Sequence, residues 1–357
     1  MSTAAASPLP NWRRAWRETV AQAEHSRAHI RAQTSDFQVR EILGYEFSGD
    51  GEHDYLLIEK EHANTTWVAQ QLAVHAGIPP RDVGFAGLKD RHSVSRQWFS
   101  VRRPAGAATD WSAFTRPGLG VIESTRHRRK LRRGAHRANC FNIAVRGLNV
   151  SCRPSDALLQ GIREQGVPNY FGEQRFGQAG GNLEMARSLF RGRRLSRLQR
   201  SMALSAARAY IFNHILEQRV EDGSWNQLLS GDCASLDGSG SIFPVNEPDK
   251  ELRQRVTLLD VHPSGALWGK GPGACRGQVA VLEQRIASDF TDLAAGLEQF
   301  TEQARRPLRL AARLFEWRWD DDTLWLEFTL TRGGFATAVL REIVDYRDAA
   351  ASMGNVE

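Results

Sequence analysis

The residues best suited to chemistry lie in the stretch GFAGLKDRH, residues 84–92. An apolar segment typical of a strand ends here at Gly87, where the backbone can turn tightly, and Lys89 and Asp90 follow. Reactive groups are common in the loops that follow strands, and a carboxylate there can act as a nucleophile that adds covalently to a substrate. Taken alone, the same pattern is more typical of a surface turn, so its interpretation depends on the rest of the chain.

A partly buried nucleophilic carboxylate needs a nearby cation or hydrogen-bond donors to stay ionised. Lys89, the preceding residue, and Arg31 are the two candidates for supporting the charge of Asp90. Successive residues on a strand point to opposite faces, so the sequence does not choose between these cations.

A dense run of basic residues indicates a nucleic acid as partner. No acidic residue occurs from Ser124 to Ser155, and the chain carries a net charge of +6. Basic side chains release counterions when they bind phosphates, which favours RNA or DNA over a merely solvated charged face. The run comprises Arg126, Arg128, Arg129, Lys130, Arg132, Arg133 and Arg137. A second cluster is equally compatible with an RNA contact and with a solvated face: Arg187, Arg191, Arg193, Arg194, Arg197 and Arg200.

Composition limits the class of protein. The chain has 357 residues, of which 41% are hydrophobic, enough for about two domains with a real core. Its four cysteines lack metal-ligand spacing, and we expect no metal site and reduced thiols in a cytoplasmic protein. No window approaches the ~20 apolar residues of a membrane span, and residues 1–31 hold no signal sequence. We expect a monomer that does not bind membranes.

The elements that must position Asp90 follow from hydrophobic periodicity. Residues 37–42 and 55–60 predict two strands of a hairpin-like start, followed by a helix that ends near Gly77. Further strands are predicted at 83–86, 97–101 and 140–146, and alternating apolar residues predict a hairpin over 315–330. Helical periodicity governs the remainder, with helices over 183–215, 278–304 and 335–346 and Gly- and Pro-rich loops over 231–277. This order predicts an α+β fold with a helix-rich insertion.

Five separated motifs resemble those of the TruD-type tRNA pseudouridine synthases. They are AGLKD at 86–90 with Ser95 and Gln97-Trp98 downstream, Asn139-Cys140-Phe141, VPNYFGEQRFG at 167–177, LSAAR at 204–208, and GFAT at 334–337 with Arg341-Glu342. Their order and their spread over about residues 31–346 identify the chain as similar to this family. The chain departs from the family pattern in having Gln33-Thr34-Ser35 where Asn-Pro-Glu is usual, and Arg31 where a lysine is common. Neither change affects Asp90.

The resemblance implies an isomerase that converts uridine in tRNA to pseudouridine, with Asp90 as nucleophile and no cofactor. The implied target is uridine 13 in the D-arm of a glutamate tRNA. The implied fold is α+β: a catalytic domain with a mixed or antiparallel sheet, formed by residues 29–165 and 310–347, is interrupted by a helix-rich TRUD domain at 166–309. Tails would occupy residues 1–28 and 348–357. The resemblance also implies substrate contacts from Phe37, Asn139 and Phe335.

These roles agree with the chemistry of the side chains. Flat rings such as those of Phe37, Phe141 and Phe335 can hold an extruded base by stacking, and Asn139 can donate to and accept from the edge of uracil. Phe141 alternates with Ile143, which makes core packing equally compatible with the pattern, whereas the position of Phe335 before a helix favours function. Asn169, Gln174 and Arg175 are interpreted as part of a buried junction between the domains rather than as RNA contacts.

Two other classes remain as alternatives. A non-catalytic RNA-binding protein would explain the basic runs and the aromatic residues, but not the aspartate behind AGLK. A tRNA methyltransferase would need a glycine-rich turn between a strand and a helix, and GQAGG at 177–181 follows no clear strand. The sequence leaves open whether Asp90 attacks the base or the ribose.

Overall fold

The computed structural model describes residues 9–16, 28–103, 108–150 and 153–350. The chain divides into two compact units, each assembled from separated segments. Unit 1 comprises the described parts of residues 1–19, 155–312 and 334–343, and unit 2 comprises those of 20–154, 313–333 and 344–357. The α+β fold is confirmed. Helices α2 (Asp156–Gln165) and α8 (Ala336–Ile343) lie in ranges that were expected in the catalytic domain, and both belong to unit 1.

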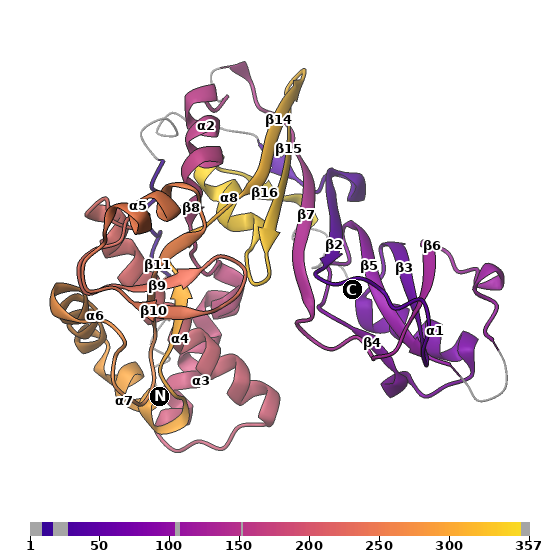
Figure 1. The fold of residues 1–357 in the computed structure, drawn as a ribbon, viewed down its shortest axis with the longest axis horizontal. Helices are drawn as coiled ribbons and strands as arrows, with labels where there is room; N and C mark the ends of the chain where they lie inside the picture. The colour runs from indigo at the N-terminus through magenta and orange to yellow at the C-terminus, as the bar shows by residue number, and fades with distance from the viewer. Residues whose placement is uncertain (1–8, 17–27, 104–107, 151–152, 351–357) are drawn as a thin grey trace, which may run out of the picture. The chain divides into compact units, whose positions relative to one another are not determined.

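Unit 2 is built on one mixed sheet of eight strands (Figure 1). Seven strands follow the order β14-β15-β7-β2-β5-β3-β6, and β4 pairs with β5. All pairs are antiparallel except β2 with β5. The strands are β2 (Phe37–Leu43), β3 (His53–Glu61), β4 (Val83–Phe85), β5 (Val94–Arg102), β6 (Leu119–His127), β7 (His136–Val145), β14 (Arg313–Asp320) and β15 (Thr323–Thr331).

Three further features complete the frame of unit 2. Helix α1 (Thr65–Ala76) buries Val68 and Leu72 in a cluster with Ile58 and Phe99 from the sheet, and Gly77 ends it at φ 64°. Short 3-10 helices occur at Thr34–Asp36, Pro80–Asp82 and Trp111–Ala113. The strands β1 (His29–Ile30) and β16 (Arg347–Asp348) form a separate parallel pair, which joins the two ends of the unit.

Unit 1 is packed around the long helix α4, which is buried along one side from Ala203 to Val220. The helices of unit 1 are α2 (Asp156–Gln165), α3 (Gly181–Phe190), α4 (Arg197–Glu221), α5 (Lys250–Thr257), α6 (Gly277–Asp289), α7 (Thr291–Phe300) and α8 (Ala336–Ile343), with 3-10 turns at Glu173–Phe176 and Gln178–Gly180. Four strands form a sheet in the order β10-β9-β11-β12: β9 (Cys233–Leu236), β10 (Ile242–Pro244), β11 (Val261–Leu267) and β12 (Ala304–Pro307). The short strands β8 (Val167–Pro168) and β13 (Arg309–Leu310) pair with each other.

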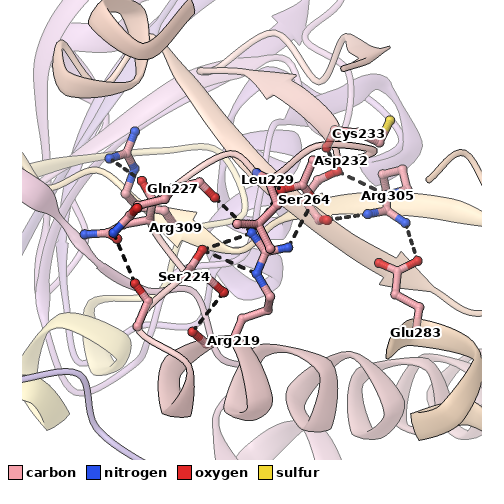
Figure 2. A network of polar contacts seen from close by, with 12 residues as sticks. Arg219, Ser224, Gln227, Leu229, Asp232, Cys233, Ser264, Glu283, Arg305 and Arg309 are labelled. Atoms are coloured by element: carbon pink, nitrogen blue, oxygen red, sulfur yellow. Dashed lines mark hydrogen bonds and ion pairs between the residues drawn. The ribbon is translucent and has the colours of Figure 1, made fainter. Parts of the chain in front are cut away.

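A buried polar network ties α4 to the small sheet of unit 1 (Figure 2). Arg219 of α4 pairs with Asp232 at 3.0 Å, and both side chains are almost fully buried. Arg305 of β12 pairs with Glu283 of α6 at 2.7 Å. Removing one partner of such a pair would leave an uncompensated buried charge, so this network fixes one arrangement of helix and sheet.

Most predicted elements are confirmed, and five predictions are wrong. Strands 37–42 and 55–60 are not a hairpin, because β5 lies between them and pairs with both. The segment 278–304 is two helices broken at Phe290 and then a strand, and the loops at 231–277 contain β9, β10, α5 and β11. The last helix ends at Ile343 instead of Tyr346. The N-terminal tail is partly folded, because Trp12 is buried against Tyr170 and His214.

No helix in the described ranges is long and apolar enough to cross a membrane.

Candidate active site

The loop at residues 86–93 is fixed to the sheet of unit 2 by polar side chains. Gln97 of β5 donates from Nε2 to the Gly87 carbonyl at 2.7 Å, and the Lys89 N–H donates to Thr65 Oγ1 at 2.9 Å. Thr65 and Gln97 are both buried and hydrogen-bonded to each other at 3.0 Å. A satisfied buried network of this kind specifies a single conformation, so the loop is held at a defined place on the sheet.

Two further donors hold the main chain of Asp90. The Nζ of Lys60 on β3 donates to the Asp90 carbonyl at 2.8 Å and to the Ala63 carbonyl at 2.8 Å, and Ser93 Oγ donates to the Asp90 carbonyl at 2.9 Å. Burial lowers the pKa of Lys60 to about 8, and the negative charge of Asp90 opposes this lowering. A fully buried cation therefore anchors the backbone of Asp90 through its carbonyl.

The Asp90 side chain projects from this anchored backbone and is 55% exposed. Its Oδ2 lies 2.8 Å from Nη2 of Arg31, whose side chain is only 8% exposed. Lys89 instead pairs with Glu41 of β2, with Nζ and Oε1 2.9 Å apart and both side chains buried. Burial raises the pKa of Glu41, and the charge of Lys89 opposes this rise. Of the two cations that the sequence left open, Arg31 is the one that contacts Asp90.

Asn139, Phe141 and Phe37 lie on one face of the sheet with Glu41. On the paired strands β7 and β2, Asn139 is opposite Glu41 and Phe141 is opposite Val39. Directly opposed residues of an antiparallel pair share a face. The Oδ1 of Asn139 is buried, and no described residue donates a hydrogen bond to it. Asn139 therefore carries an unpaired acceptor.

The rings of Phe37 and Phe141 are buried, with 5% and 7% exposure. Phe141 stacks on Phe328 at 5.5 Å between centroids and meets Phe37 edge-on at 6.1 Å. The Cζ of Arg31 lies 4.1 Å from the centroid of the Phe37 ring. These contacts favour packing for Phe141, and they make Phe37 a support for Arg31.

Phe335 belongs to unit 1, immediately before α8, and is 37% exposed. The Cζ of Arg175 lies 5.9 Å from its ring centroid, and Arg175 donates to Ser205 Oγ at 3.0 Å. Phe335 is therefore the predicted substrate aromatic with a substantially open ring.

The 167–177 motif forms a buried corner of unit 1. Asn213 of α4 bonds both the N–H and the carbonyl of Phe171, and Arg306 donates to Asn169 Oδ1 at 2.6 Å. Arg306 also covers the Phe171 ring at 4.1 Å. The motif thus has a packing role within unit 1.

The basic run continues from β6 into the loop before β7, and its side chains are exposed. The loop is docked beside the Asp90 loop, because the Gly134 N–H donates to the Ala86 carbonyl at 2.7 Å. Arg128 forms an exposed ion pair with Asp50 at 2.9 Å, a kind of pair that contributes little stability. The cationic surface consists of Arg126, Arg128, Arg129, Lys130, Arg132 and Arg133. No group of three or more potential metal ligands occurs among the residues that the structure describes.

Sequence reasoning missed Lys60, Glu41 and Asp348. The first two had a signal: Lys60 is in phase with Leu56 and Ile58 on its strand, and all three are fully buried. Glu41 is likewise in phase with Phe37. A charged residue on the apolar face of a strand indicates a buried polar partner. Asp348 had no such signal, because its strand has two residues and pairs with the other end of the chain.

Comparisons with known proteins identify the family of the chain. The family model described as tRNA pseudouridine synthase D (TruD) matches residues 17–193 and 192–343. The chain is 45% identical over 324 residues to tRNA pseudouridine synthase D of Methylococcus capsulatus, covering 90% of this chain and 92% of that protein. It is 42% identical over 322 residues to the protein of the same name from Aeromonas salmonicida, covering 90% and 91%.

A solved structure described as tRNA pseudouridine synthase D (TruD) from Methanosarcina mazei has the same fold, with a TM-score of 0.71 at 20% identity. The match covers 90% of this chain and 94% of that one. The family match and the two relatives extend over nearly the whole chain, and the chain belongs to the TruD family of tRNA pseudouridine synthases.

Proposed function

We propose that this protein converts uridine 13 in the D-arm of a glutamate tRNA to pseudouridine, with Asp90 as the nucleophile. The observation that carries the proposal is the half-exposed carboxylate of Asp90 at 2.8 Å from a buried guanidinium, on a loop held by Lys60, Thr65 and Gln97. An exposed acid on a surface turn would need no such support.

The reaction requires little beyond a nucleophile and a means of holding the base. The bond from ribose C1′ to N1 of uracil breaks, the base turns over, and C1′ joins C5; C5 loses a proton and N1 gains one. The product is an isomer of the substrate, so the balance requires no oxidant, reductant or group donor. Addition of the Asp90 carboxylate to the base or to the ribose divides this change into easier steps.

Each unit carries residues that we propose to contact the substrate. In unit 2, the unpaired Oδ1 of Asn139 suits a donor such as the N3–H of uracil, because an unpaired buried acceptor is costly. The ring of Phe37 packs against the guanidinium of Arg31, which in turn contacts Asp90. In unit 1, the exposed ring of Phe335 suits stacking on a base taken out of its helix.

The tRNA backbone is proposed to bind the cationic surface of residues 126–133. The loop that carries this surface is joined to the Asp90 loop by the Gly134–Ala86 hydrogen bond. Phosphate contacts position RNA without reading its sequence, so this surface orients the tRNA and leaves the choice of uridine to other contacts. The β-rich unit 2 is the proposed catalytic domain and the helical part of unit 1 the proposed TRUD domain, acting as a cytoplasmic monomer without cofactor.

A tritium-release assay tests the activity and the target together. The substrate is a glutamate tRNA transcript labelled at uracil C5, and the matched control carries cytidine at position 13. We expect release from the first and none from the second, in buffer without added cofactor. Undiminished release from the control would reject the target, and the absence of release from any tRNA would reject the activity.

A further inference from the structure

Arg31 is held by two carboxylates, one on each terminal nitrogen. Its Nη2 lies 2.8 Å from Asp90 Oδ2, and its Nη1 lies 2.6 Å from Asp348 Oδ2. Asp348 comes from a segment that the sequence indicates to be a tail, yet it lies in β16 with its side chain 23% exposed. The second carboxylate therefore has a defined place in the proposed active site.

We propose that Asp348 is a positioning residue that limits Arg31 to a single hydrogen bond with Asp90. The inference rests on the proposed function of Asp90 as nucleophile. Arginine and carboxylate often pair through two parallel hydrogen bonds, which would engage both oxygens of Asp90. Asp348 occupies Nη1, so Arg31 cannot pair with Asp90 through both terminal nitrogens. The buried Nε of Arg31 has no partner among the described residues, so the orientation that Asp348 gives the guanidinium also keeps Nε off Asp90. Within the described ranges Oδ1 of Asp90 accepts no hydrogen bond. Asp348 thereby keeps one oxygen of the nucleophile free for the substrate.

The backbone is arranged to make this three-part contact. Ile30 and Asp348 are in register in the β1–β16 pair, and the Arg347 N–H donates to the Ala28 carbonyl at 2.9 Å. Arg31 follows β1 at φ 57°, a left-handed conformation that is uncommon for a residue with a side chain. Such a conformation persists where surrounding contacts determine it, and here those contacts are the two carboxylates and the Phe37 ring.

Asp348 is itself oriented by the chain beyond it. Its Oδ1 accepts a hydrogen bond from the Ala350 N–H at 3.1 Å, which leaves Oδ2 directed to Arg31. The guanidinium is nearly enclosed, with 8% exposure, so removal of Asp348 would leave Asp90 as its remaining charged partner. The guanidinium would then turn to engage both oxygens of Asp90.

The test measures kcat and KM for tritium release by the full chain carrying Asp348→Ala. We expect kcat to fall by roughly 10- to 100-fold, as for a misplaced reactive group, with KM close to wild type because tRNA affinity comes from phosphate contacts. Asp348→Asn keeps the side-chain shape and the bond from Ala350, and it should lower kcat less. The matched control is Glu59→Gln, which removes a carboxylate from an exposed ion pair with Arg96 in the same unit and should leave kcat unchanged.

A second background separates positioning from a general structural effect. Lysine cannot form the two-pronged contact of arginine, so in Arg31→Lys the Asp348→Ala change should cost about twofold or less. An equal cost in both backgrounds, or wild-type kcat for Asp348→Ala, would overturn the positioning role and leave the proposed function intact. No tritium release by the wild type would reject the proposed function itself.

Discussion

Phe141 and Phe335 make a matched pair that separates packing from substrate contact. Phe141 is 7% exposed and packs on two other rings, so its replacement by alanine should cost ~3–5 kcal/mol of unfolding free energy. Phe335 is 37% exposed, so about two thirds of its surface is covered. Full burial of such a ring is worth ~1.5–3 kcal/mol, which gives about 1–2 kcal/mol for Phe335→Ala.

The kinetic effects should run in the opposite order. Base stacking on an aromatic ring contributes ~1–3 kcal/mol, and the loss of that amount from the transition state lowers turnover by about 5- to 150-fold. We expect this loss for Phe335→Ala, with tRNA affinity close to wild type because many phosphate contacts contribute to it. The folded fraction of Phe141→Ala should keep much of its specific activity.

The assay combines denaturant unfolding with tritium release from labelled tRNA under single-turnover conditions. Specific activity is referred to the folded fraction of each variant. A large fall in stability with normal specific activity for Phe335→Ala would show that Phe335 is a packing residue. A stability change below about 1 kcal/mol for Phe141→Ala would refute the reasoning from burial.

Three further outcomes follow from the structure. Replacement of Arg128, Arg129 and Arg132 by glutamate should weaken the binding of all tRNAs alike and flatten the salt dependence of affinity, measured by filter binding. If the slope of affinity against salt concentration is unchanged, the basic run is a solvated surface that does not contact tRNA. The pKa of Lys60 is about 8 in the folded state, against 10.5 for a free lysine. Between these two pH values the folded state therefore binds fewer protons than the unfolded state, which makes folding more favourable as the pH rises. The stability of the wild type relative to Lys60→Met should accordingly rise from pH 8 to pH 10 in denaturant titrations. A flat or falling difference would contradict the burial of a charged lysine. Trp12→Ala should cost ~3–5 kcal/mol in thermal unfolding, and wild-type stability would show that the N-terminal segment is not docked.

Local pattern predicted the elements that lie within one stretch of chain. The hairpin over 315–330 and the helix ending at Gly77 could be predicted, because alternation of apolar and polar residues and a helix stop signal are local features of the sequence. The insertion of β5 between β2 and β3 could not be predicted, since β2 and β5 pair residues that are 56 positions apart along the chain, such as Gln38 and Val94. The break at Phe290 was also missed, because the helical period continues across it.

In the site, too, local features could be predicted from the sequence and long-range contacts could not. Asp90 stands out in sequence because a strand and a glycine precede it, and Arg31 was one of two cations that could serve it. Geometry decided between them, because Lys89 turns to Glu41 on the neighbouring strand. Asp348 could not be inferred, since only the pairing of β1 with β16 brings it to Arg31. The fold assembles the site from both ends of the chain.

Pseudouridine formation by the Asp90→Asn variant tests the central claim most directly. The change is nearly isosteric and keeps an oxygen within reach of Arg31, so melting temperature and tRNA affinity should match the wild type. With enzyme in excess over labelled glutamate tRNA, we expect tritium release by this variant to fall below detection while the wild type completes its turnover. Release at the wild-type rate by Asp90→Asn would contradict the assignment of Asp90 as the nucleophile.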